Sequence, residues 1–202
     1  MLLWCAARPL VLASRSASRR AMLEAAGIPV EISVPQIDER AVEAAAGPLG
    51  PVDAAVLLAS EKAKAVARRL PGRLVTGADQ TLALGTRRFD KPADRAAARG
   101  QLAALAGHTH ELHSAVAVAR NDDILFAATD TARLTMRRLS EAFLDRYMEA
   151  AGAAVLDSVG AYQLEKLGIH LFERVDGDHF TILGLPLLRL LDFLRHEGSL
   201  AQ

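Results

Sequence analysis

The sequence predicts a three-layer α/β fold in which helices cover both faces of a central mixed sheet. Short apolar runs alternate with stretches of helical periodicity, which is typical of strands and helices that follow one another in a layered domain. Turn signals at Gly85 and at residues 121–123 separate strand-like runs and predict two hairpins, so part of the sheet must be antiparallel. A length of 202 residues with 51% hydrophobic content is sufficient for one large core.

The elements of the first half follow from where apolar periodicity starts and stops. Residues 10–13 form an apolar strand pattern that runs into a turn rich in serine and arginine. A helix is expected from about residue 17 until Gly27 stops it, followed by a short strand at 30–34 and a polar loop at 35–40. The next predicted elements are a helix at 53–69 capped by Asp53, a buried strand at 74–79 and a hairpin at 80–89.

The second half continues the alternation and contains no repeats, low-complexity stretches or linkers. Its predicted elements are a helix at 94–105, a hairpin of strands at 109–119 and 124–136, a helix at 140–150, a strand at 171–175 and a final amphipathic helix at 186–196. Residues 159–169 are predicted to be irregular. We therefore expect a single domain over residues 1–202.

Composition restricts the classes of partner. The 24 basic residues balance 24 acidic ones, and aromatic residues make up 4% of the chain, so no nucleic-acid partner is expected. No apolar run approaches the ~18–20 residues that span a bilayer, so no membrane partner is expected. Cys5 is the single cysteine, which excludes an internal disulfide and fits a cytoplasmic protein.

The polar turn after residues 10–13 combines hydroxyl and guanidinium donors with a predicted helix start. Such a helix end directs free backbone N–H groups at the turn and attracts phosphates. Ser14 and Ser16 add hydroxyl donors, and Arg19 and Arg20 add forks that fit phosphate oxygens. The alternative is an ordinary helix start with Ser16 or Ser18 as N-cap and solvated arginines. A cation near a helix N-terminus interacts unfavourably with the helix dipole, at a cost of roughly 0.3–1 kcal/mol, and a bound anion would offset this cost.

Two further charged residues stand in apolar surroundings. Leu58 and Val66 flank Lys62 one turn away on either side, so its stem is expected to lie along apolar surface with the ammonium directed at a partner. Asp79 follows an apolar strand, which places its carboxylate at the carboxyl end of a strand, where ligands bind in open α/β sheets. The alternative for Lys62 is a solvated surface lysine, and the alternative for Asp79 is a turn residue before Gln80.

Carboxylates at predicted loop or strand-end positions are candidate ligands for Mg²⁺, which binds through one or two carboxylates and substrate phosphates. They are Asp38, Glu39, Asp79 and Glu165. A solvated loop acid is the alternative for Glu39. The tract from His108 to His113 looks like a metal motif, but strand geometry turns His113 away from the other histidines and no thiolate is near, so no metal is expected there.

Taken together, the motifs resemble the Maf family of nucleoside triphosphate pyrophosphatases, which have an inosine-triphosphatase-like fold. The resemblance extends over residues 9–196. The matching segments are 12–20, 37–39, 58–63, 77–79, 90–92, 160–162, 172–174 and 184–187.

The resemblance implies hydrolysis of the α–β phosphoanhydride of a nucleoside triphosphate to a monophosphate and pyrophosphate. It implies a divalent metal, Mg²⁺ or Mn²⁺, held by Glu39 and Asp79, with Asp79 also activating water. Phosphates would be bound by Arg19, Lys62 and Lys91, and the pocket would be lined by Ser14 and Ser16. The family further implies a homodimer and roles in nucleotide-pool cleaning and in arrest of cell division.

Departures from the commonest family pattern concern the base. Gln80 stands where many members have Thr, and Glu165 where many have Gln; Arg15 and Asp90 also differ. Gln80 and Glu165 are more similar to the branch that acts on 7-methyl-GTP than to the pyrimidine branch. The alternative function is a non-catalytic nucleotide-binding regulator of septum formation. The joint presence of Asp79 with the other charged site residues favours the enzyme.

Overall fold

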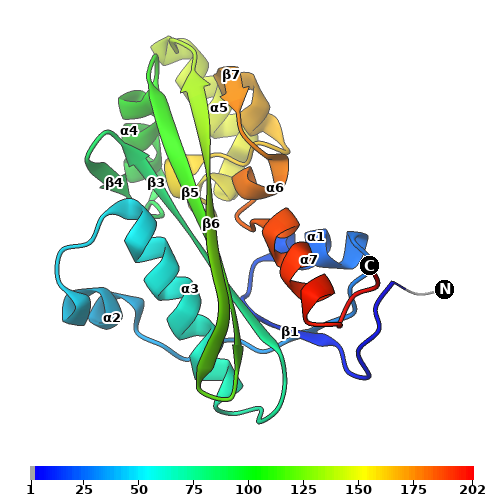
Figure 1. Cartoon of the computed structure of the whole chain (residues 1–202). Helices are drawn as coiled ribbons and strands as arrows, with labels where there is room; N and C mark the ends of the chain where they lie inside the picture. The colour runs from blue at the N-terminus through cyan, green and yellow to red at the C-terminus, as the bar shows by residue number, and fades with distance from the viewer. Residues whose placement is uncertain (1–2) are drawn as a thin grey trace. The chain divides into compact units, whose positions relative to one another are not determined.

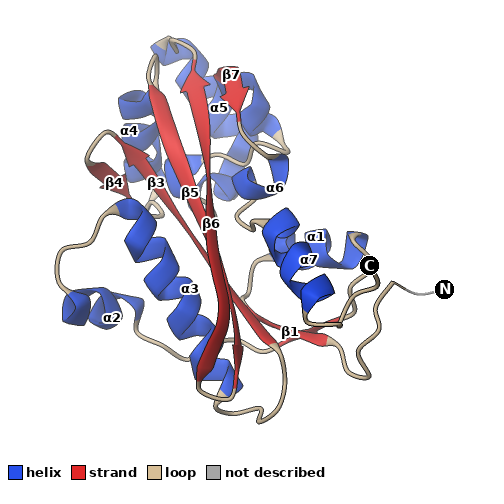
Figure 2. Ribbon diagram, in the orientation of Figure 1, coloured by secondary structure: helices blue, strands red, loops and turns tan. Residues whose placement is uncertain are grey.

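The computed structural model describes residues 3–202, and its strands form a seven-stranded mixed sheet with helices around it (Figures 1 and 2). The predicted α/β class is confirmed. The chain divides into two compact units, the first made of Met1–Gln80, Ser114–Asp130 and His179–Gln202, the second of Thr81–His113 and Thr131–Asp178. Three strands contribute residues to both units: β3 (Val75–Leu84), β5 (Thr109–Arg120) and β6 (Asp123–Met136).

The first unit is organised around the short strand β1 (Leu10–Ala13). This strand pairs in parallel with β2 (Val30–Ile32) on one side and with β3 on the other, where Ala13 lies opposite Gly77. All four residues of β1 are completely buried. A parallel strand with both faces covered requires this continuous apolar run.

Alternate residues of β1 feed two separate cores, as the two-residue period of a strand requires. Leu10 and Leu12 pack with residues of α1 (Ala17–Ala25) and α7 (Leu187–His196). Val11 and Ala13 pack with the alanine-rich face of α3 (Pro51–Ala67) on the other side. Figure 1 shows α1 and α7 side by side, and within this unit the sheet therefore lies between two helical layers, as predicted.

The second unit holds the remaining parts of the three long strands together with β4 (Arg87–Phe89) and β7 (Phe172–Asp176), which pair antiparallel with β3 and β6. Arg99 ties α4 (Arg95–Leu105) to α5 (Glu141–Ala151) through ion pairs with Glu141 and Asp145. The 3-10 helix Gly152–Leu156 follows α5, and two more, Val159–Ala161 and Leu167–Leu171, fall wholly or partly in the segment 159–169 that is predicted to be irregular.

Several predicted boundaries are wrong near the candidate site. Residues 39–40 are not loop but open the helix α2 (Glu39–Ala46), whose N-cap is Asp38. The next helix starts before Asp53, because Pro51 occupies its first turn and Gly50 is its N-cap. Strand β3 does not end at Asp79 but continues to Leu84. A short helix, α6 (His179–Ile182), was also not predicted.

Within the described residues, no helix combines the length and apolar character needed to cross a membrane. The histidine tract has partners in the protein. His110 is completely buried, its Nε2 lies 2.7 Å from the Tyr162 hydroxyl, and burial lowers its pKa to about 4. His113 contacts the Thr131 hydroxyl through Nδ1 at 3.0 Å.

Candidate active site

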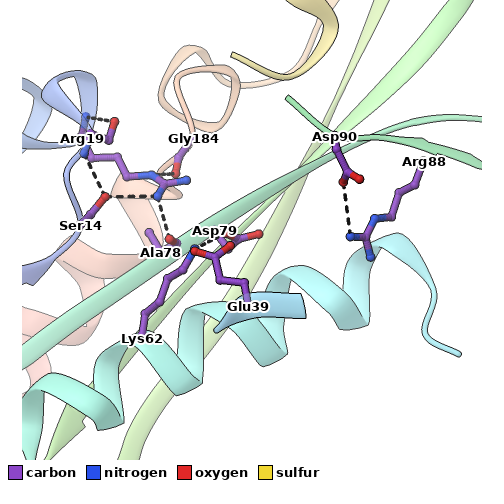
Figure 3. Close-up of polar contacts among 10 residues, drawn as sticks. Ser14, Arg19, Glu39, Lys62, Ala78, Asp79, Arg88, Asp90 and Gly184 are labelled. Atoms are coloured by element: carbon purple, nitrogen blue, oxygen red, sulfur yellow. Dashed lines mark hydrogen bonds and ion pairs between the residues drawn. The ribbon is translucent and has the colours of Figure 1, made fainter. Parts of the chain in front are cut away.

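A buried ion pair joins helix α3 to strand β3 in the first unit. The Lys62 Nζ lies 2.6 Å from the Asp79 Oδ1, and each residue is 8% exposed (Figure 3). The prediction that the Lys62 ammonium is directed at a partner is confirmed. Removing two charges from water has a desolvation cost that can exceed the attraction between them, so a buried ion pair is weak evidence for a stabilising role. Buried charged groups of this kind are common at functional sites.

Gly77 allows the helix that carries Lys62 to approach the strand that carries Asp79. A Cβ at position 77 would lie 2.1 Å from the Ala59 carbonyl oxygen and 2.7 Å from the Ala63 nitrogen. Because position 77 has no side chain and Ala59 and Ala63 are small, the backbone of α3 lies directly against the backbone of β3. Because residues two apart share a face of a strand, Gly77 and Asp79 both point towards α3.

Arg19, in the first turn of α1, is the second cation of this unit. Its guanidinium donates to two backbone carbonyls, from Nη1 to Ala78 at 2.7 Å and from Nε to Gly184 at 2.7 Å, and more weakly to the Ser14 hydroxyl at 3.4 Å (Figure 3). These bonds hold Arg19 beside the residue that precedes Asp79. Within the described chain they leave Nη2 to donate to a ligand.

The two serines of the turn organise this arginine and the start of the helix. Ser16 is the N-cap of α1 and accepts from the Arg19 backbone N–H at 3.3 Å, so the ordinary helix-start interpretation is correct for this residue. Ser14 is buried, and its hydroxyl oxygen accepts from the Ser16 N–H at 3.2 Å. Solvated arginines, the other part of that interpretation, describe Arg20 and not Arg19.

Glu39 brings a second carboxylate to the same ammonium. It lies in the first turn of α2, and its Oε1 is 2.9 Å from the Lys62 Nζ, with half of its side chain exposed. Residues 3–202 contain no group of three or more His, Cys, Asp or Glu side chains placed to hold a metal ion. Two carboxylates held together by one ammonium instead fit a Mg²⁺ that keeps several waters and takes further oxygens from a phosphate.

Burial shifts the proton equilibria of the charged groups here. It raises the pKa of Asp79 above the ordinary 3.8, although the charges of Lys62 and Arg19 act in the opposite direction. Burial also lowers the pKa of the Arg19 guanidinium, opposed by the charges of Asp79 and Glu39. Asp79 is therefore a more basic carboxylate than one in water, which suits proton abstraction from a water molecule.

The raised pKa predicts how stability depends on pH. Between pH 3.8 and the pKa of folded Asp79, the folded state binds the proton more tightly than the unfolded state, so this group favours folding at low pH and the contribution is lost as pH rises through that window. The free energy of unfolding of the wild type, relative to an Asp79→Asn variant, should thus fall as pH rises from about 4 in denaturant titrations. A difference that grows with pH would show that the pKa is lowered instead.

Gln80 points to the opposite face of β3 from Asp79. Its Nε2 donates to the Ser114 hydroxyl at 2.9 Å and to the carbonyls of Thr181 and Ile182 at 3.1 and 3.0 Å. Together with the Arg19 bond to Gly184, these contacts fix the backbone of residues 181–184. The Gln80 amide nitrogen already donates to acceptors within the protein, so this geometry does not support the predicted contact between Gln80 and substrate.

Sequence reasoning missed Ser114 and the backbone of 181–184 as parts of the site. Ser114 donates to the Thr181 carbonyl at 2.7 Å from the middle of a buried strand. A serine in an apolar run carries no spacing that predicts this contact. Gly184 lies in a segment that matches the family pattern, but Arg19 contacts its backbone carbonyl, which the residue type does not predict.

Arg20 does not join this cluster, and two other predicted site residues belong to the second unit. Arg20 is exposed and pairs with Glu24 at 2.7 Å, one helical turn away. Lys91 and Glu165 are exposed residues of the second unit, on the loops before α4 and after the second 3-10 helix. Their predicted roles remain predictions.

Fold and site together define a class of protein: an α/β protein with a buried carboxylate between two cations, next to a helix start, which suits chemistry on a polyanion. The particular family is clear from comparison. The chain belongs to the Maf family, because the model of the Maf-like protein family matches residues 9–197.

Curated relatives are similar along the whole chain. A protein of Rhodopseudomonas palustris strain BisB18 named nucleoside triphosphate pyrophosphatase is 56% identical over 100% of both chains. A protein of Rhizobium meliloti named 7-methyl-GTP pyrophosphatase is 49% identical over 95% of this chain and 97% of its own. Among solved structures, a HAM1 protein from Coxiella burnetii matches 65% of this chain and 74% of its own, with 19% identity and a TM-score of 0.43.

Proposed function

We propose that this protein is a nucleoside triphosphate pyrophosphatase, a hydrolase that splits the α–β phosphoanhydride to release a monophosphate and pyrophosphate. The observation that carries the proposal is the buried Asp79 carboxylate, held by Lys62 and next to Arg19. The names of relatives that are 49–56% identical over nearly the full length of both chains support the same reaction class.

In the proposed mechanism, each charged residue acts on water or on phosphate. Asp79 orients a water molecule and accepts its proton as the water attacks phosphorus. Lys62 and the Nη2 of Arg19 stabilise negative charge that develops on the phosphoryl oxygens. Lys91 is proposed to bind a further phosphate. Ser14 holds Arg19 in place, because its hydroxyl accepts from the guanidinium.

Glu39 and Asp79 are proposed to hold a divalent cation together with the substrate. The cation, when bound, supplies Lewis-acid stabilisation of the phosphates. Lys62 keeps the two carboxylates close to each other before substrate arrives, since its ammonium contacts both.

The proposed reaction predicts its products and its metal requirement. Purified protein with Mg²⁺ or Mn²⁺ should convert a nucleoside triphosphate into monophosphate and pyrophosphate, measured by ³¹P NMR, and EDTA should stop turnover. Lys62→Met should lower kcat/KM by about 10²-fold or more, while Lys64→Met on the same helix, where the partly buried Lys64 pairs with Glu61, should not. Release of orthophosphate and a nucleoside diphosphate would refute the reaction class.

The preferred base is proposed to be 7-methylguanine. Support comes from the identity of Gln80 and Glu165 and from the Rhizobium meliloti relative. Because the Gln80 amide nitrogen holds residues 181 and 182, we infer that it shapes the base pocket through that backbone. The kcat/KM for 7-methyl-GTP should exceed those for dTTP and UTP by at least about tenfold. The opposite order would contradict the assignment.

A further inference from the structure

The side chain of Gln101, in the middle of α4, joins two loops of the second unit. Its Nε2 donates to the Asp90 carbonyl at 2.8 Å, and its Oε1 accepts from the Gly160 backbone N–H at 3.1 Å. The donor and the acceptor of one amide are thus divided between two segments 70 residues apart in sequence. One segment leads directly into Lys91, and the other is the turn that precedes Glu165.

The turn that Gln101 holds has a backbone that is rarely adopted. Gly160 has a φ of 78° and Ala161, which is completely buried, has a φ of 61°. A left-handed alanine persists only where its surroundings determine it, and such residues concentrate at functional sites. Gly160 is confined on its other side, because an added Cβ would lie 2.6 Å from the Leu82 side chain and 2.8 Å from the ring of Tyr162.

The loop that Gln101 holds is fixed on both sides of Lys91. The Asp90 carbonyl belongs to the peptide bond that links Asp90 to Lys91, so the bond from Gln101 fixes the orientation of that peptide. Pro92, on the other side, is buried and has a restricted φ. Lys91 itself is exposed and is therefore directed by its backbone, not by packing.

We propose that Gln101 is a positioning residue that locks the Lys91 loop to the 160–162 turn, so that the phosphate-binding lysine is presented in one orientation. This inference rests on the proposed function, in which Lys91 binds a phosphate. Neighbouring polar residues of α4 have a different role, since Arg95 and Arg99 bond to α5 and to the residue that follows it.

Three variants separate positioning from general stability. Gln101→Leu removes both hydrogen bonds and keeps the approximate size. Gln101→Glu keeps an acceptor for the Gly160 N–H but replaces the donor to the Asp90 carbonyl with a second oxygen. Arg99→Leu is the matched control, because it removes a polar tie of the same helix without touching either loop.

Both Gln101 variants should raise KM for the triphosphate about tenfold, with kcat changed less than about threefold, whereas Arg99→Leu should leave KM unchanged. In a Lys91→Ala background, Gln101→Leu should add no further increase in KM. Additive effects, or an equal change of KM in Arg99→Leu, would overturn the proposal.

Hydrogen exchange tests the lock without any turnover. The Gly160 amide should exchange at least about tenfold faster in Gln101→Leu than in the wild type and in Gln101→Glu, measured by NMR. Unchanged exchange in Gln101→Leu would overturn the proposed lock even if KM rises. Absence of pyrophosphatase activity in the wild type would instead contradict the proposed function, and faster Gly160 exchange would still identify the lock.

Discussion

Replacing Asp79 with Asn is expected to lower kcat for pyrophosphate release about 10³-fold. The amide has nearly the same shape as the carboxylate, but it cannot accept a proton from water and binds a divalent cation poorly. The arrangement of α2 against α3 should persist, because Lys62 still pairs with Glu39. Steady-state kinetics with a saturating triphosphate measures the effect, and far-UV circular dichroism verifies the fold.

The matched control for this substitution is Asp122→Asn. Asp122 is an exposed aspartate paired with Arg68 at 2.7 Å, and its conversion should leave kcat within about twofold of the wild type. An Asp79→Asn enzyme that keeps its full rate would show that another group activates the water.

Gly77→Ala is expected to have the largest effect on stability of the glycine-to-alanine substitutions in the described part of the first unit. The new Cβ meets the backbone of α3 at 2.1 Å from the Ala59 carbonyl oxygen, and backbone cannot move aside as a flexible side chain can. Helix and strand must separate, at a cost of roughly 3 kcal/mol or more in the free energy of unfolding. The same separation draws Lys62 away from Asp79, so activity should fall even where the protein remains folded.

Gly100→Ala provides the comparison. Gly100 lies in the exposed interior of α4, where an added Cβ meets nothing within 4 Å, so alanine should raise the free energy of unfolding by roughly 0.5–1 kcal/mol. Urea titration of the wild type and both variants measures the two effects. A Gly77→Ala protein as stable as the wild type would contradict the close backbone approach.

The sequence predicts the first unit well where apolar periodicity is strong. The strand at Leu10–Ala13, the helix that follows and the direction of Lys62 all come from a regular spacing of buried residues. Helix α2 is not predicted because its apolar residues are alanines and a single valine, and none of its residues is buried. The sequence predicts that Asp79 ends its own strand, but β3 continues past it to Leu84. The strand that ends near Asp79 is β1, whose last residue, Ala13, lies opposite Gly77.

The partners of Arg19 could not be predicted from residue types. Two of them are backbone carbonyls, at Ala78 and Gly184, which lie 59 and 165 residues away in sequence. Every residue has a carbonyl, so no motif identifies one as an acceptor. The same applies to Gln80, whose contacts with Thr181 and Ile182 depend on a short helix that has no sequence signal of its own.

Above all, we propose that one triphosphate is bound by the charged residues of the first unit. A crystal structure of the protein with Mg²⁺ and a non-hydrolysable α,β-methylene nucleoside triphosphate tests it most directly. We predict phosphate oxygens within about 3.2 Å of the side-chain nitrogens of Arg19 and Lys62, and the cation on Glu39 and Asp79. A triphosphate bound away from Asp79, with the Lys62 ion pair untouched, would contradict the account.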